Sequence, residues 1–118
     1  KSVIIIGDGA FANCRSLTAV TFPNSIKKIK RYAFYGCESL ASVVIPDGVR
    51  EIARGTFEGC ESLTTVIIPN SVKKIGWDVF YACNSLTNVT ISYSLFRSQR
   101  YIFDEGLRQF LDIKFTFT

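Results

Sequence analysis

The stretch FYGCESLASVVIPDGVREI (residues 34–52) returns almost unchanged as FEGCESLTTVIIPNSVKKI (residues 57–75). Related stretches begin at Phe11 and Phe80, so each copy starts 23 residues after the one before it. The cysteines keep the same interval and are Cys14, Cys37, Cys60 and Cys83. Disulfide frameworks and zinc sites usually space their cysteines unequally, whereas a constant interval indicates an internal repeat. The sequence therefore predicts a solenoid of stacked coils.

Within each copy, a strand pattern is followed by a residue that stops the strand. The portion Leu-x-x-Val-x-Ile alternates like a strand with one buried face. Pro69, which follows it in the third copy, has no N–H to donate to a strand partner, and Asn70 favours a tight turn. Upstream, the apolar positions lie about three residues apart, which favours a short helical or 3₁₀ turn. Because one copy cannot bury its own apolar face, we expect stacked copies to share a continuous core.

The pattern Ala-Phe-x-x-Cys followed by Leu-x-x-Val-x-Ile-Pro resembles the BspA-type leucine-rich repeat, also called the Treponema pallidum type. The resemblance covers residues 2–97 with four near-complete copies. It implies an α/β repeat solenoid in the form of a short arc, with a parallel β-sheet on the concave side and short helical or 3₁₀ turns opposite. It also implies a cell-surface or secreted protein of host-associated bacteria or parasitic protists. Members are associated with adhesion, co-aggregation and the binding of matrix proteins such as fibronectin and fibrinogen.

The repeat boundaries predict one domain over residues 1–118. We assign 1–5 to the end of a preceding repeat and 98–118 to a degenerate capping repeat, with four repeats between them at 6–28, 29–51, 52–74 and 75–97. In the cap, Leu107 is aligned with the repeated Phe, Phe110 with Cys and Ile113 with Leu. Asp104 is then predicted to be the N-cap of a helical turn that runs to Leu111, and the alternation of apolar residues from Ile113 to Phe117 predicts a strand.

Composition excludes several classes of protein. The chain is 47% hydrophobic with a net charge of +4, unlike a disordered tail, and its longest apolar run (Val3 to Ile6) is too short to cross a membrane. No secretory signal is visible. Histidine is absent, which removes the usual general base and the commonest metal ligand. Ser-x-x-Lys occurs at Ser25 and again at Ser71, and such recurrence reflects the repeat rather than a nucleophile. We therefore expect no enzyme activity, cofactor or metal.

The cysteines have two open interpretations. Neighbouring copies would place their Cα atoms about 5 Å apart, which a disulfide accepts, but the side chains would point in the same direction. Thiols that fill small gaps in a repeat core are the simpler interpretation, and some disulfide bonding is the alternative. A tetrahedral Cys₄ metal site does not suit a linear ladder.

Two surfaces are candidate binding sites. The first is the outward face of the predicted sheet, where the candidate residues are Thr21, Ser42, Val44, Thr65, Ile67 and Thr90. It is small, uncharged and partly apolar, and it is either a recognition surface or an inert ladder of good strand formers. The second is a predicted basic stripe, whose candidate residues are Lys27, Lys28, Lys30, Arg31, Arg50, Arg54, Lys73 and Lys74.

The basic stripe could attract sulfated glycans or acidic protein surfaces, or it could serve solubility alone. Nucleic acid is not expected, because the stripe has no interleaved aromatic residues of the kind that stack on bases. At the N-terminal end, Ile4 and Ile5 occupy columns that are charged in the other copies. They either pack against a preceding element or form a contact surface, which makes homo-association through this end a further hypothesis.

These observations together favour a non-catalytic protein-binding or adhesion module. It would engage host or neighbouring-cell macromolecules through a rigid solenoid surface. The alternative is a structural spacer in a longer repeat array that has no ligand of its own.

Overall fold

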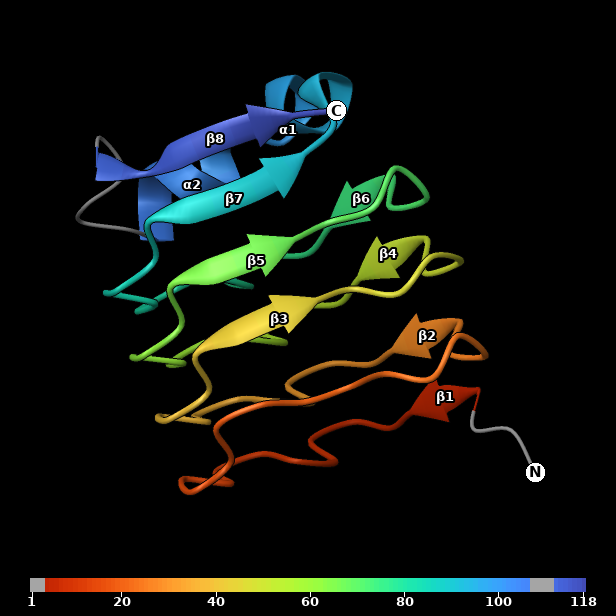
Figure 1. The fold of residues 1–118 in the computed structure, drawn as a ribbon, viewed down its shortest axis with the longest axis vertical. Coiled ribbons are helices and arrows are strands. Elements are labelled where there is room, and N and C mark those ends of the chain that lie inside the picture. The colour runs from red at the N-terminus through yellow and green to blue at the C-terminus, as the bar shows by residue number, and fades with distance from the viewer. Residues whose placement is uncertain (1–3, 107–111) are drawn as a thin grey trace.

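The computed structural model describes residues 4–106 and 112–118. The chain winds into coils stacked along the longest axis, with the N-terminal coil at one end and two short helices at the other (Figure 1). It measures 41 × 29 × 20 Å along its principal axes. The predicted repeat solenoid with parallel sheets is confirmed.

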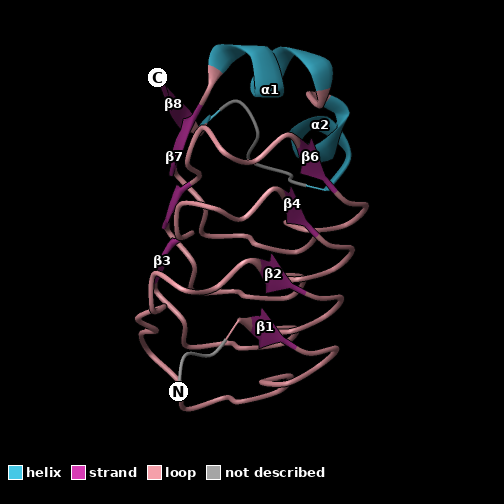
Figure 2. Cartoon of the chain, turned by 90° about the vertical axis from the view of Figure 1, so that its right-hand side faces the viewer, coloured by secondary structure: helices cyan, strands magenta, loops and turns pink. Residues whose placement is uncertain are grey.

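Two parallel sheets run along the stack. The major sheet has the order β3-β5-β7-β8 and is formed by Ser42–Val44, Thr65–Ile67, Asn88–Ile91 and Lys114–Phe117. The minor sheet has the order β1-β2-β4-β6 and is formed by Ile5–Ile6, Lys28–Ile29, Glu51–Ile52 and Lys74–Ile75. Figure 2 shows the two sheets on different sides of the coils. The sequence indicated only the major sheet, because two-residue strands are too short to show an alternation.

The major sheet keeps the register of the repeat. Val43 pairs with Val66 and Val66 with Val89, so the buried column stays 23 residues apart. Residues 18–22 carry the same sequence pattern, yet they form no strand. In this first coil Phe22 stands where later coils have Ile45 and Ile68, and its ring packs edge-on against Phe34 with the centroids 5.7 Å apart. Thr21 therefore lies outside the sheet on which we had placed it.

The segments with apolar spacing of three form single turns that do not join into helices. Some N–H groups close local turns, as when Cys37 N donates to Phe34 O. Others bond to the next coil, as when Phe34 N donates to Thr56 O and Gly36 N to Glu58 O. Within residues 4–92 no α- or 3₁₀-helix forms, because each turn segment contains two residues with positive φ, four positions apart, that interrupt a helical backbone.

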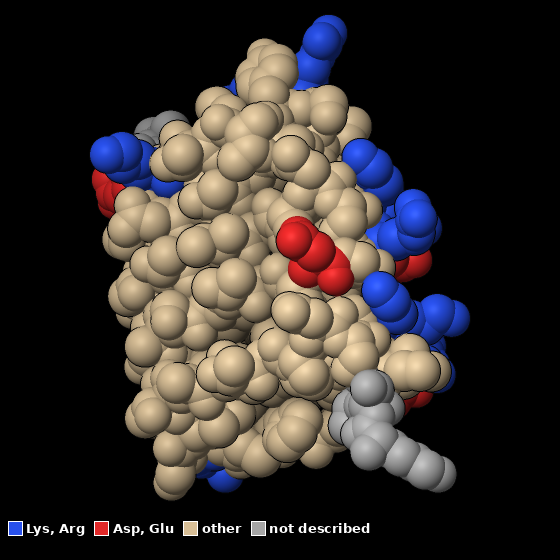
Figure 3. Space-filling model, turned by 45° about the vertical axis from the view of Figure 1, so that its right-hand side comes forward, with Lys and Arg blue, Asp and Glu red and all other residues tan. Residues whose placement is uncertain are grey.

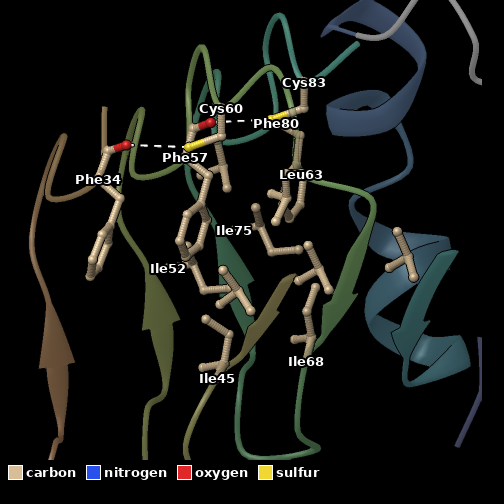
Figure 4. Packing of buried hydrophobic residues seen from close by; sticks show 14 of the residues in the cluster. Phe34, Ile45, Ile52, Phe57, Cys60, Leu63, Ile68, Ile75, Phe80 and Cys83 are labelled. Atoms are coloured by element: carbon tan, nitrogen blue, oxygen red, sulfur yellow. Dashed lines mark hydrogen bonds between the residues drawn. The ribbon is translucent and has the colours of Figure 1, made fainter. Parts of the chain in front are cut away.

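A column of phenylalanines forms the centre of the core. Phe34, Phe57 and Phe80 are fully buried, and their rings stack with centroids 5.7 and 6.3 Å apart. Each buried cysteine donates its S–H to the carbonyl of the Phe one coil earlier, as Cys60 does to Phe34 O at 3.2 Å and Cys83 to Phe57 O at 3.1 Å (Figure 4). None of the four cysteines forms a disulfide, so the structure favours thiols that fill the core.

The C-terminal cap differs from the predicted one. Helix α1 spans Tyr93–Ser98 and α2 spans Tyr101–Gly106, so α2 begins before Asp104, which is not its N-cap. Phe103 continues the phenylalanine column, with its centroid 5.5 Å from that of Phe80. The predicted Leu107 and Phe110 lie outside the described residues. The predicted strand is present as β8, although Val89 pairs with Phe115, one residue away from the predicted alignment.

Candidate functional site

The outer face of the major sheet is the first candidate surface, and we call it the sheet face. Val44 lies beside Ile67 in the parallel register, and Ile67 lies beside Thr90. Val44 is 58% exposed and Ile67 is 39% exposed, although both are apolar. The structure thus brings together Ser42, Val44, Thr65, Ile67 and Thr90 as expected, on strands whose other face is buried in the core. Thr21 is exposed, but it lies outside the strands of the sheet.

The second candidate surface is a hollow over the minor sheet, which we call the basic groove. It has a volume of about 530 Å³ and is lined by Asp8, Lys27, Lys28, Ile29, Lys30, Arg31, Gly48, Arg50, Glu51 and Ala53. Five of the eight predicted basic residues line it. Figure 3 shows Lys and Arg side chains gathered along this side of the molecule, with few acidic side chains among them.

The other three basic residues lie on neighbouring coils. Lys74 pairs in register with Glu51 of the groove, and Lys73 donates its backbone N–H to Arg50 O at 2.8 Å. Arg54 follows Ala53 of the groove and is exposed at the surface. The predicted stripe therefore consists of one groove and a continuation along the stack.

Two carboxylates in the basic groove were not among the predicted site residues. Asp8 forms an ion pair with Arg31, with Oδ2 3.5 Å from Nη2, and its Oδ1 accepts the backbone N–H of Arg31. Glu51 projects from β4 between Lys28 and Lys74 of the adjacent strands. Both lie at repeat positions that hold Lys or Arg in other coils. A comparison of the charges at each repeat position would therefore have identified them from the sequence.

A contact between the exposed Trp77 and the half-buried Tyr101 was not among the predictions. Trp77 stands in the same repeat column as Arg31 and Arg54, and it packs against Tyr101 of α2 with the centroids 5.2 Å apart. The sequence did carry a signal for this position, because Trp77 is aromatic where the other copies have a charged residue. Its contact with the cap could not be inferred, because the cap leaves the repeat pattern.

The titratable groups in the core do not form reactive sites. Burial raises the pKa of the Cys60 thiol to about 12 and raises the pKa of Cys83 well above its ordinary value. These thiols stay protonated at neutral pH and are poor nucleophiles. Burial also raises the pKa of the Glu58 carboxyl, with a further contribution from nearby Asp78.

Neither a metal-binding cluster nor a membrane-spanning helix is present among the residues that the structure describes. In residues 4–106 and 112–118, no group of three or more Cys, Asp or Glu side chains is placed to hold a metal ion. Of the helices described, neither is long and apolar enough to cross a bilayer.

Comparisons with known proteins agree with the fold. Residues 1–114 match the family described as BspA type Leucine rich repeat region (6 copies). A leucine-rich repeat protein from Bacteroides ovatus ATCC 8483 superposes with a TM-score of 0.83 at 34% identity, over 98% of this chain and 28% of that one. The T. pallidum Leucine Rich Repeat protein gives a TM-score of 0.73 at 32% identity, over 98% of this chain and 46% of that one.

A third structure is described as a leucine rich cell surface protein from Faecalibacterium prausnitzii A2-165. It has a TM-score of 0.55 at 31% identity, over 74% of this chain and 29% of that one. The chain thus spans less than half the length of each of these proteins. A search of curated proteins gave no match. From the repeat, the coil geometry and these matches, the chain belongs to the family of BspA-type leucine-rich repeats.

Proposed function

We propose that this chain is a protein-binding module of a cell-surface or secreted protein and that it binds its partner through the sheet face. Leucine-rich repeats are commonly protein-interaction modules and are typically non-catalytic. The observation that carries the proposal is the exposure of Val44 and Ile67, side by side on a sheet whose other face is anchored in the core. Adjacent exposed apolar side chains on a rigid surface are typical of the centre of an interface.

Rigidity supports this proposal on energetic grounds. The strands are held by parallel pairing on both sides of β5, and Val66 between Thr65 and Ile67 is fully buried. A partner would therefore meet a surface that does not have to become ordered on binding, which lowers the entropic cost of association. The surface location is supported by the likeness to the Faecalibacterium prausnitzii protein, which is described as a cell surface protein.

The test is binding of the purified chain to immobilised fibronectin and fibrinogen, the partner class implied by the family. Ile67→Lys should weaken binding at least about thirtyfold, because it places a charge at the centre of the contact. Ser62→Lys is the matched control, since it adds the same charge to the same coil at an exposed turn position and should leave binding unchanged.

Two outcomes would contradict the proposal. Equal loss of binding in both variants would show that added charge, rather than the sheet face, controls binding. No binding to either protein by a chain shown to be folded would favour the alternative of a structural spacer, which has no ligand of its own.

A further inference from the structure

The basic groove is a hollow because two of its positions lack bulky side chains. Gly48 has a φ of +98°, and a Cβ added there would lie 2.8 Å from the Nζ of Lys27. The absent side chain at Gly48 therefore gives the Lys27 ammonium its place in the groove. On the other side of the hollow, Ala53 occupies the repeat position that holds Lys30 one coil earlier.

Most cations of the groove have no carboxylate partner. Within the described part of the chain, ion pairs with N···O distances up to 4.0 Å are formed by Arg31 with Asp8 and by Arg15 with Glu38. Lys27, Lys28, Lys30 and Arg50 therefore carry positive charge that no described acidic side chain neutralises at this distance. Glu51 also lines the hollow and offsets part of this charge, but the four cations outnumber it and leave a positive field that attracts an anion.

The positive charge also continues along the stack. Lys27, Arg50 and Lys73 occupy one repeat column, and parallel pairing of strands spaces successive coils by about 4.8 Å. A ligand with a single charge would use only part of this surface. A linear polyanion that lies along the column would meet a cation at each coil.

The side chains of the groove narrow the class of polyanion. Binding sites for protein side chains rely on apolar and aromatic anchors, but Ile29 of the groove is only 2% exposed and Ala53 is small. Non-specific sites for single-stranded nucleic acids combine cations with aromatic rings that stack on bases, and no aromatic residue lines the groove. A polyanion with a polar backbone and closely spaced charges fits these observations.

We propose that the basic groove binds a sulfated polysaccharide, whose sulfates contact Lys27, Lys28, Lys30 and Arg50. This site is separate from the sheet face, since it lies over the minor sheet, and the two can be tested independently. Recognition is by charge on a preformed surface, so the affinity depends strongly on salt.

The experiment measures binding of the full chain to heparin, with desulfated heparin, polyglutamate and a single-stranded DNA oligonucleotide as comparison ligands. For heparin, the logarithm of the affinity should fall with the logarithm of salt concentration with a slope of about −3, as expected for four contacts. The double variant Lys27→Glu/Arg50→Glu should weaken heparin binding at least about tenfold. Arg97→Glu/Lys114→Glu is the matched control, because it changes the net charge equally at exposed positions outside the groove.

Thermal unfolding of each variant first establishes that it is folded. Tight heparin binding that is lost in the groove variant but kept in the control supports the proposal. Equal weakening in both variants overturns it, because net charge alone would then account for binding. Absence of heparin binding by the folded wild-type chain overturns it as well.

Equal or tighter binding of desulfated heparin, polyglutamate or DNA rejects the assignment to a sulfated polysaccharide. Heparin binding that is independent of Ile67→Lys separates this site from the sheet face.

Discussion

Two positions in each coil hold the backbone in the left-handed region. One column contains Gly9, Tyr32, Gly55 and Asp78, and the other contains Asn13, Gly36, Gly59 and Ala82, all with φ between 58° and 75°. A residue with a Cβ is disfavoured in this region by about 1–2 kcal/mol, whereas glycine is not. The two columns explain why the turn segments stay turns. They also show that two of the eight positions hold residues poorly suited to them, Tyr32 and Ala82, since Asn and Asp adopt this region more readily than other residues with a Cβ.

This strain leads to a prediction about a matched pair in one column. Ala82→Gly should raise the free energy of unfolding by about 0.5–1 kcal/mol. Glycine removes the energetic cost of the positive φ in the folded state, and this gain exceeds the stabilisation of the unfolded state by the greater entropy of glycine. Gly59→Ala should lower it by a similar amount. A Cβ at Gly59 would meet only Gly36 Cα at 3.6 Å and Gly36 N at 3.7 Å, which are ordinary contacts, so the loss would report φ and not a clash.

Urea denaturation of both variants measures these changes. Destabilisation by Ala82→Gly, or a neutral Gly59→Ala, would contradict the account of the turn segments.

At the scale of elements, the coils are held together by columns of like residues. Phe11, Phe34, Phe57 and Phe80 stack at centroid distances of 5.2, 5.7 and 6.3 Å, with interplanar angles of 8–15°. The strands on either side are only two to four residues long, and isolated strands of that length contribute little stability. Ring packing inside the stack therefore carries much of the contact between neighbouring coils.

The position of a ring in the phenylalanine column should determine how much its removal lowers the free energy of unfolding. Phe57→Ala should lower the free energy of unfolding by about 3–5 kcal/mol, because the ring is fully buried between two others. Phe11→Ala should cost markedly less, since Phe11 is 40% exposed and stacks on one side only. Denaturant unfolding of the two variants gives both values, and equal losses would be inconsistent with a column whose first ring is at an open end.

How far the elements could be predicted varies along the chain. The strands β3, β5 and β7 were predictable, because each has an alternation of buried and exposed residues, and Pro46 and Pro69 follow closely after the first two. The first copy has the same alternation without a strand, and its local departure is Phe22 in the column that holds Ile45 and Ile68 in later copies. In the cap, Phe103 rather than the predicted Leu107 joins the phenylalanine column, stacked on Phe80. Phe103 lies 23 residues after Phe80, so the repeat period itself indicates this residue, and the predicted alignment with Leu107 departed from that period.

At the scale of the whole molecule, the two ends of the stack differ. The C-terminal end is covered by α1, α2 and β8 (Figures 1 and 2). The first coil, by contrast, carries exposed apolar side chains. Ile4 and Ile5 are 54% and 50% exposed there. An exposed apolar patch at the end of a stack is a site where another chain can pack.

We accordingly expect this chain to associate with itself at high concentration through the N-terminal coil. Light scattering over a concentration series should show a rising mean mass, and Ile5→Lys should reduce it by placing a charge in the contact. Val44→Lys is the control, because it adds the same charge to an equally exposed apolar position on the sheet face. A strict monomer at the highest concentration, or equal effects of the two variants, would refute association through this end.

The sequence alone determined the repeat, its 23-residue period, the buried columns and the solenoid that they form. These follow from local alternation and from apolar residues that recur at a constant interval, both of which are properties of the chain itself. Only the tertiary structure decided the minor sheet and the hollow that gathers Lys27, Lys28, Lys30 and Arg50 around Gly48. Each of these depends on contacts between coils, where register and side-chain volume set the outcome. A periodic sequence indicates which residues share a column, but not how much space lies between the columns.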